Sequence, residues 1–348
     1  MSLMDRIKKN SSIEIASVLD ESEVFGERQL IPTEVPVINI ALSGTLKGGL
    51  TSGVTEIAGP SKHFKTGIAL LLMRAFLKKH KDGIILFYDA EFGTPGSYFE
   101  TFGIDMKKVF HTPITDVEQL KQDIMKQLAE MKRGDHLMIV IDSIGQLASL
   151  KEVEDALEGK SVADMTRAKA IKSLFRMITP HLRIKDIPLV VVNHTYMEIG
   201  MFPKAVTGGG MGMYYAADTI WIVGRQQEKV DNAVAGFNFI INVEKSRFVK
   251  EKSKLPISVT FEKGIEPYSG LLEIAIAGGF VTKPMPGWYL KPGSKTKVRE
   301  ADTKTEGFWK DILANEEFDA YIRKNYEVAY GDILGNDEST KEIPTSER

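Results

Sequence analysis

The alternation of short apolar runs with amphipathic helical patterns, from about residue 54 to 224, most constrains how this chain folds. Several of the apolar runs lack polar positions, which is typical of parallel strands covered on both faces. The expected strands are 53–59, 83–89, 136–143, 187–194 and 218–224, and the helix patterns lie at roughly 65–80, 115–133 and 164–185. This order predicts an α/β domain built on a mostly parallel central sheet.

The flanking segments differ in character from this region. Segments 236–247 and 254–264 follow each other without a helix between them, so we expect antiparallel edge strands. The polar residues 1–35 predict an N-terminal arm, 36–268 the core, and 269–348 a small C-terminal extension. The extension contains a helical stretch and ends in a polar tail that we expect to be disordered.

Composition and charge narrow the class of protein. Of the 348 residues, 43% are hydrophobic and 26% charged, as in soluble globular proteins. The absence of cysteine excludes disulfides and thiol catalysis. The chain shows no signal peptide and no apolar stretch long enough to cross a membrane, so we expect a cytoplasmic protein without a membrane partner. At a net charge of −2, any polyanion must be held by local basic clusters.

A candidate phosphate-binding loop, GPSKHFKT, lies between the first expected strand and the first helix. It resembles the pattern G-x-x-x-x-G-K-[ST], in which backbone amides cradle phosphates, the lysine reaches the outer phosphates and the hydroxyl binds Mg²⁺. Phe64 replaces the second glycine and reduces backbone freedom there. The alternative is an ordinary strand–loop–helix with a coincidental Lys-Thr pair. The nucleotide-binding candidates are Gly59, Pro60, Ser61, Lys62, His63, Phe64, Lys65 and Thr66.

Two further strand ends carry carboxylates. Asp142 ends the apolar run MIVID and is placed to hold Mg²⁺ at the carboxyl edge of the sheet. Glu91 follows the strand that ends at Asp89 and is a candidate general base for an attacking water. Taken alone, Asp142 is a weak signal because any strand can end in aspartate, and Glu91 is equally compatible with a solvated carboxylate at a turn. Together, three successive strand ends carry groups suited to bind phosphate, to act as a general base and to bind a metal ion.

These segments, with FYDAEFG, MIVIDSIGQL, VVVNHT and TGGGMGMYYAADTIWIV, resemble the nucleotide core of RecA-type recombinases. EDALEGKSVADMTRAKAIKSLFRMITP and NVEKSRFVKEKSK resemble more specifically the UvsX-type recombinases of T-even-like bacteriophages. The resemblance runs from about residue 35 to 330. It implies a RecA-like P-loop ATPase core whose N-terminal arm serves polymerisation, and it makes Phe64 a family variant.

The resemblance assigns roles at the nucleotide site to several residues. Tyr98 corresponds to an aromatic that stacks on adenine, and His194 stands where bacterial relatives carry a glutamine that senses the γ-phosphate. Lys245 and Arg247 correspond to a pair that reaches the neighbouring subunit's ATP and stabilises charge in the transition state. The alternative for this basic pair is an edge strand that uses charges against aggregation.

Two loops are implied to bind DNA, at 154–167 and 195–215. In the second, Met201 and Phe202 suit insertion between bases or packing on a neighbouring protomer, and Gly208, Gly209 and Gly210 permit close backbone approach. From Lys160 to Lys185 there are seven basic residues against one acid. Within this cluster, Arg167 and Lys172 are the predicted DNA contacts, although a solvated basic helix face would look the same.

The leading hypothesis is an ATP- and Mg²⁺-dependent recombinase that forms helical filaments on single-stranded DNA and pairs it with homologous duplex DNA. It would act in recombination, repair and recombination-dependent replication as a DNA-dependent ATPase yielding ADP and phosphate. The resemblance implies a recombination mediator and a single-strand-binding protein as partners, and a viral protein acting in the bacterial host cytoplasm. The alternatives are a RecA-like hexameric DNA helicase and a non-hydrolysing DNA-binding accessory protein.

Overall fold

The computed structural model describes residues 1–26, 29–160, 165–198, 205–230 and 233–328. The chain divides into two compact units. The first comprises residues 1–31, 50–58 and 65–218, and the second residues 32–49, 59–64 and 219–348. Among the described residues, no helix is both long and apolar enough to span a membrane.

The first unit is built on a sheet whose strands follow the order β1-β5-β4-β2-β3. The pairs β2–β3, β2–β4 and β4–β5 are parallel, and the short β6 adds an antiparallel pair to β5. β1 and β4 are buried along their whole length because helices cover both sheet faces. The strands are β1 (Gly53–Gly59), β2 (Ile84–Asp89), β3 (Val109–Pro113), β4 (Leu137–Asp142), β5 (Pro188–Met197) and β6 (Ala205–Thr207).

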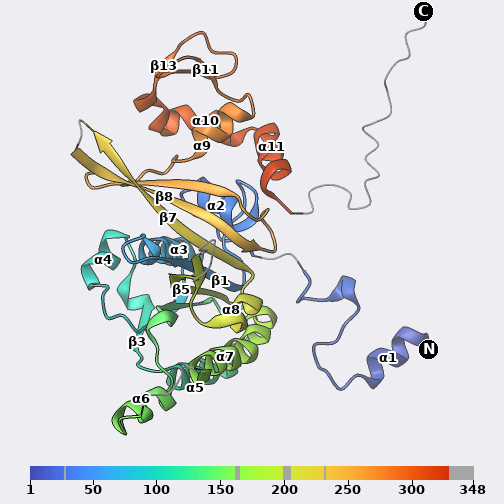
Figure 1. Ribbon diagram of the computed structural model, residues 1–348. Helices are drawn as coiled ribbons and strands as arrows, with labels where there is room; N and C mark the ends of the chain where they lie inside the picture. Colours follow the sequence, from blue (N-terminus) through green and yellow to red (C-terminus); the bar gives the residue numbers. More distant parts are fainter. Residues whose placement is uncertain (27–28, 161–164, 199–204, 231–232, 329–348) are drawn as a thin grey trace, which may run out of the picture. The chain divides into compact units, whose positions relative to one another are not determined.

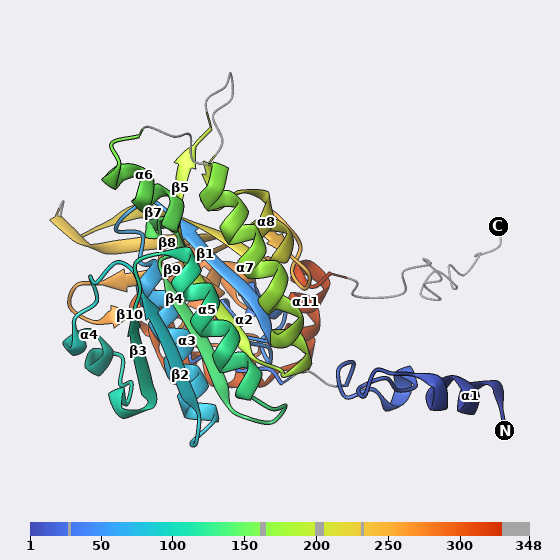
Figure 2. The same ribbon diagram turned by 90° about the horizontal axis from the view of Figure 1, so that it is seen from below.

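Helices pack on both faces of this sheet. Figures 1 and 2 show α5 and α7 on one face and α3 on the other. The helices of this unit are α1 (Leu3–Asn10), α3 (Lys65–Lys79), α4 (Gly96–Thr101), α5 (Val117–Glu130), α6 (Leu150–Leu157), α7 (Met165–Ile184) and α8 (Gly210–Ala216). Three short 3₁₀ helices complete it, η1 (Leu19–Glu21), η2 (Met106–Lys108) and η3 (Ile144–Gln146). The α/β class and the mostly parallel sheet expected from the sequence are confirmed.

The second unit is antiparallel. Its larger sheet has the order β10-β9-β8-β7, and α2 packs against β9. A three-stranded sheet, β11-β12-β13, lies in the C-terminal part. The elements are α2 (Pro36–Ser43), β7 (Thr219–Val230), β8 (Ala233–Ser246), β9 (Lys254–Thr260), β10 (Gly264–Ile265), α9 (Leu271–Ala277), β11 (Thr282–Met285), β12 (Trp288–Leu290), β13 (Val298–Arg299), η4 (Glu300–Lys304), α10 (Glu306–Ala314) and α11 (Glu316–Tyr326).

Candidate functional site

Lys65, Thr66 and Asp142 meet at the carboxyl edge of the parallel sheet. The two residues of the loop open α3, and Asp142 ends β4. The Thr66 hydroxyl donates to Asp142 Oδ2 over 2.7 Å. Lys65 is buried; burial lowers its pKa, while the carboxylates of Glu91 and Asp142 act in the opposite direction. The site therefore holds a buried cation beside two carboxylates, an arrangement suited to phosphate and a divalent metal.

Asp142 carries a free ligand position for a metal. Its Oδ1 is buried and has no hydrogen-bond partner among the described residues. Burial raises the pKa of Asp142 to about 6, the nearby Glu91 and Asp89 add to the shift, and the hydrogen bond from Thr66 opposes it. A bound cation would favour the ionised form. A hydroxyl, a carboxylate and phosphate oxygens are the donors that Mg²⁺ takes in nucleotide sites, so these residues fit it.

Glu91 is held by two neighbours at this edge. The Ser143 hydroxyl donates to its Oε1 over 2.7 Å, and His194 Nε2 lies 2.6 Å from the same oxygen. Gln146 Nε2 is 3.4 Å from His194 Nε2. Glu91 and His194 are each about one-third exposed, so both can still reach a ligand. The structure thus brings Glu91 and His194 together. The sequence did not predict the hydrogen bond from Ser143 to Glu91.

The turn that presents Glu91 is fixed by Asp89. Its Oδ1 accepts hydrogen bonds from the backbone amides of Glu91 and Phe92, at 3.1 and 2.7 Å. Its Oδ2 lies 3.1 Å from His111 Nε2 on the adjacent strand β3. Asp89 is itself buried at the end of β2, so Glu91 projects from a rigid turn. A strand-final aspartate two residues before a candidate base is a signal that the sequence does offer.

The loop before Lys65 contains left-handed backbone at residues other than glycine, including the position of the missing second glycine. Lys62 and Phe64 both have left-handed backbone, with φ of 61° and 57°. Phe64 therefore adopts the left-handed backbone conformation that a glycine would allow, even though its side chain restricts the backbone. His63 Nδ1 lies 2.8 Å from the Ser61 carbonyl oxygen.

Tyr98 lies on α4, which follows the Glu91 turn in the chain. Its ring meets Phe102 edge to face, with centroids 5.3 Å apart. It is half-buried, and burial raises its pKa. Part of its surface therefore remains accessible to a ligand.

Asn193 connects β1 to the second predicted DNA loop. It is fully buried, and its Nδ2 donates to Glu56 Oε1 and to the Gly208 carbonyl oxygen, both over 2.7 Å. Gly209 and Gly210 have φ of 91° and 70°, and α8 begins at Gly210. A side chain at either position would be strained. Met201 and Phe202 lie outside the described residues.

The two basic DNA candidates have different surroundings. Lys172 is exposed on α7, as a phosphate contact requires. Arg167, five residues earlier on α7, donates instead to the carbonyl oxygens of Leu147 (2.6 Å), Gly145 (2.8 Å) and Ile144 (3.2 Å). Its guanidinium thus holds the turn that follows Asp142 and Ser143, a role that sequence reasoning missed.

Lys245 and Arg247 belong to the second unit. Lys245 is half-buried near the end of β8, and Arg247 is exposed just beyond it. In the antiparallel pair with β7, Lys245 lies opposite Ile220.

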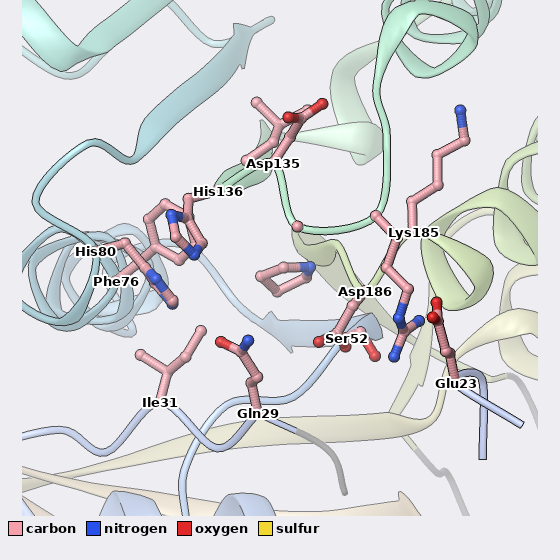
Figure 3. Close-up of a pocket in the computed structure, with 14 residues that line it drawn as sticks. Glu23, Gln29, Ile31, Ser52, Phe76, His80, Asp135, His136, Lys185 and Asp186 are labelled. Carbon is pink, nitrogen blue, oxygen red and sulfur yellow. The ribbon is translucent and has the colours of Figure 1, made fainter. Parts of the chain in front are cut away.

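A cavity of about 310 Å³ lies at the opposite edge of the parallel sheet, where β1, β4 and β5 begin. Figure 3 shows His80 and His136 on one side of it, and Gln29 and Ile31 from the N-terminal segment on another. The two imidazole centroids are 4.1 Å apart. Ligands of open α/β sheets bind outside the carboxyl ends of the strands, and none of the predicted site residues lines this cavity.

Comparison with known proteins identifies the family of this chain. A model of the RecA N-terminal domain matches residues 4–266. The chain belongs to the RecA family. A second model, of the C-terminal domain of the bacteriophage T4 recombination and repair protein, matches residues 268–322.

Relatives of this RecA-family protein extend over most of its length. The recombination and repair protein of Enterobacteria phage T4 is 44% identical over 94% of this chain and 86% of its own length. Protein RecA of Thermus aquaticus is 25% identical over 73% of each chain, and that of Borreliella afzelii is 25% identical over 92% and 90%. The resemblance to phage RecA-type recombinases is confirmed, and the protein is a recombinase of this family.

Proposed function

We propose that this recombinase binds ATP with Mg²⁺, hydrolyses it to ADP and phosphate, and assembles on single-stranded DNA to drive homologous pairing and strand exchange. One observation carries the nucleotide part: Lys65, the Thr66–Asp142 pair and the Glu91–Ser143–His194 cluster share one edge of the sheet. Membership of the RecA family supports the DNA part.

Each residue has a distinct task in this proposal. Lys65 pairs with the outer phosphates, and its burial strengthens that attraction because water screens it poorly. Thr66 and Asp142 would hold Mg²⁺, which would supply positive charge to neutralise the phosphates. Glu91 accepts a proton from the attacking water. Because Ser143 and His194 fix Glu91 through one oxygen, Oε1, its other oxygen is available to that water.

The test is DNA-stimulated ATP hydrolysis by matched variants. Glu91→Gln should retain ATP and DNA binding and lose hydrolysis by at least about a hundredfold, the usual contribution of a general base. Lys65→Ala should lose nucleotide binding as well. The control is Glu100→Gln, at an exposed glutamate on α4, which should hydrolyse ATP like the wild type. Normal hydrolysis by Glu91→Gln would refute the assignment of the base.

Assembly is tested by electron microscopy with single-stranded DNA and a non-hydrolysable ATP analogue. Extended helical filaments that require the nucleotide support a recombinase, because head-to-tail contacts that do not close give open polymers. Closed rings would favour a hexameric helicase.

A further inference from the structure

The phosphate loop contains two residues whose backbone conformation their side chains disfavour. Lys62 and Phe64 have φ of 61° and 57°, in the left-handed region. Glycine adopts this region freely, whereas a bulky residue is a genuine outlier there. The conformation persists only if the surroundings hold it.

Phe64 is held by a ring stack within the second unit. Its ring lies nearly parallel to that of Phe239, with centroids 5.1 Å apart and an interplanar angle of 19°. Phe239 projects from β8 and is only 4% exposed, so it is a fixed surface. Offset stacks at this distance are favourable beyond the area they bury.

Lys62 is held from the neighbouring strand. Arg225 on β7 donates from Nη1 to the Lys62 carbonyl oxygen over 3.0 Å, and its guanidinium lies 4.7 Å over the ring of Phe237. Arg225 and Phe239 are directly opposite each other in the β7–β8 pair, so their side chains share one face. One face of the hairpin therefore braces both left-handed residues of the loop.

We propose that Phe239 is a positioning residue for nucleotide binding, which acts by stacking on Phe64 and keeping the loop in its phosphate-binding conformation. This inference rests on the proposed function, in which the loop binds ATP. Phe239 itself contacts no phosphate; it replaces the conformational freedom that a glycine at position 64 would give.

The test is a double-mutant cycle on the full chain, with the Kd for ATP in Mg²⁺ measured by calorimetry. Phe239→Leu should weaken ATP binding about two- to tenfold, the size expected for a lost aromatic stack. In a Phe64→Gly background the same change should have no effect on the Kd, because glycine needs no brace. Phe261→Leu is the control: Phe261 is 70% exposed and meets the same cluster of rings at Phe237, so this change should leave the Kd unchanged.

The possible results distinguish failure of this inference from failure of the proposed function. An unchanged Kd for Phe239→Leu, or an equal loss in both backgrounds, overturns the inference, since the second result marks a general packing defect. If the leucine variant does not fold, Phe239→Met, whose flexible side chain adapts to irregular core space, carries the same test. If the wild-type chain binds ATP no better than Lys65→Ala, the proposed function is wrong. The inference then falls with it.

Discussion

At the scale of single residues, Asp142 shows a conflict between stability and ligand binding. The carboxyl is 2% exposed and one of its oxygens has no partner among the described residues, so ionising it without a cation is costly. Its pKa in the folded chain, about 6, lies above the 3.8 of a free side chain. A cation bound at the unpartnered oxygen would relieve this cost, so the unfavourable ionisation of the metal-free site strengthens cation binding.

Asp142→Asn should therefore stabilise the metal-free protein at neutral pH while preventing Mg²⁺-dependent hydrolysis. Because the folded pKa is raised, the contribution of Asp142 to stability is fully present below pH 3.8 and is lost as the pH rises through about 6. The gap in unfolding free energy between variant and wild type should open across this window and reach about 3 kcal/mol at most.

Urea unfolding in EDTA at several pH values measures this gap. Asp20→Asn, at an exposed position, is the control and should show no comparable pH dependence. A gap that stays constant from pH 4 to pH 7 would contradict the argument.

The individual site residues were predictable where the pattern around them fixes their position. Asp142 and Glu91 follow apolar strands, and parallel strands bring their carboxyl ends to one edge. The pairing of Glu91 with His194 was not predictable from spacing, because it depends on two side-chain conformations from strands far apart in the sequence. The backbone of Phe64 was equally hidden, since its brace lies on β8.

At the scale of elements, Arg167 ties α7 to the turn η3. Its three hydrogen bonds to carbonyl oxygens link the start of α7, where the first predicted DNA loop ends, to the segment after Ser143. Ser143 in turn donates to Glu91. A change at the start of α7 can thus reach Glu91, the proposed general base, through two directly bonded segments.

Arg167→Ala should lower the free energy of unfolding by about 2 kcal/mol, because hydrogen bonds from a charged group are lost and buried carbonyls are left unpaired. It should also reduce ATP hydrolysis without DNA. Lys172→Ala, at an exposed position on the same helix, should keep this basal hydrolysis and weaken only salt-dependent DNA binding. Unchanged basal hydrolysis in Arg167→Ala would contradict the link from Arg167 to Glu91 and leave DNA contact as its predicted role.

The elements with strong periodicity were predicted nearly to their ends. The expected strand 53–59 is β1, and the helix pattern at 164–185 is α7, Met165–Ile184. β3, VFHTP, was missed because it is short and lies at the edge of the sheet, where none of its residues is fully buried. The strands β11 to β13, of two to four residues, are interrupted by proline and glycine and give no periodic signal.

At the scale of the whole molecule, the proposed roles fall on both units. Lys65 and Glu91 belong to the first unit, and Lys245 and Arg247 to the second. If the second pair completes the ATP site of a neighbouring protomer, each active site draws on two chains. A filament then hydrolyses ATP only where one chain supplies an intact first set and the next chain an intact second set.

Mixing two inactive variants tests this arrangement. Lys65→Ala lacks the first set, and Lys245→Ala/Arg247→Ala lacks the second, so each should be inactive alone. In an equal mixture with random order, about a quarter of the interfaces join two intact sets, and about a quarter of the wild-type ATP hydrolysis should return. The control mixture is Lys65→Ala with Glu91→Gln, whose defects lie in the same set and cannot compensate. Recovery in both mixtures, or in neither, would contradict a site shared between protomers.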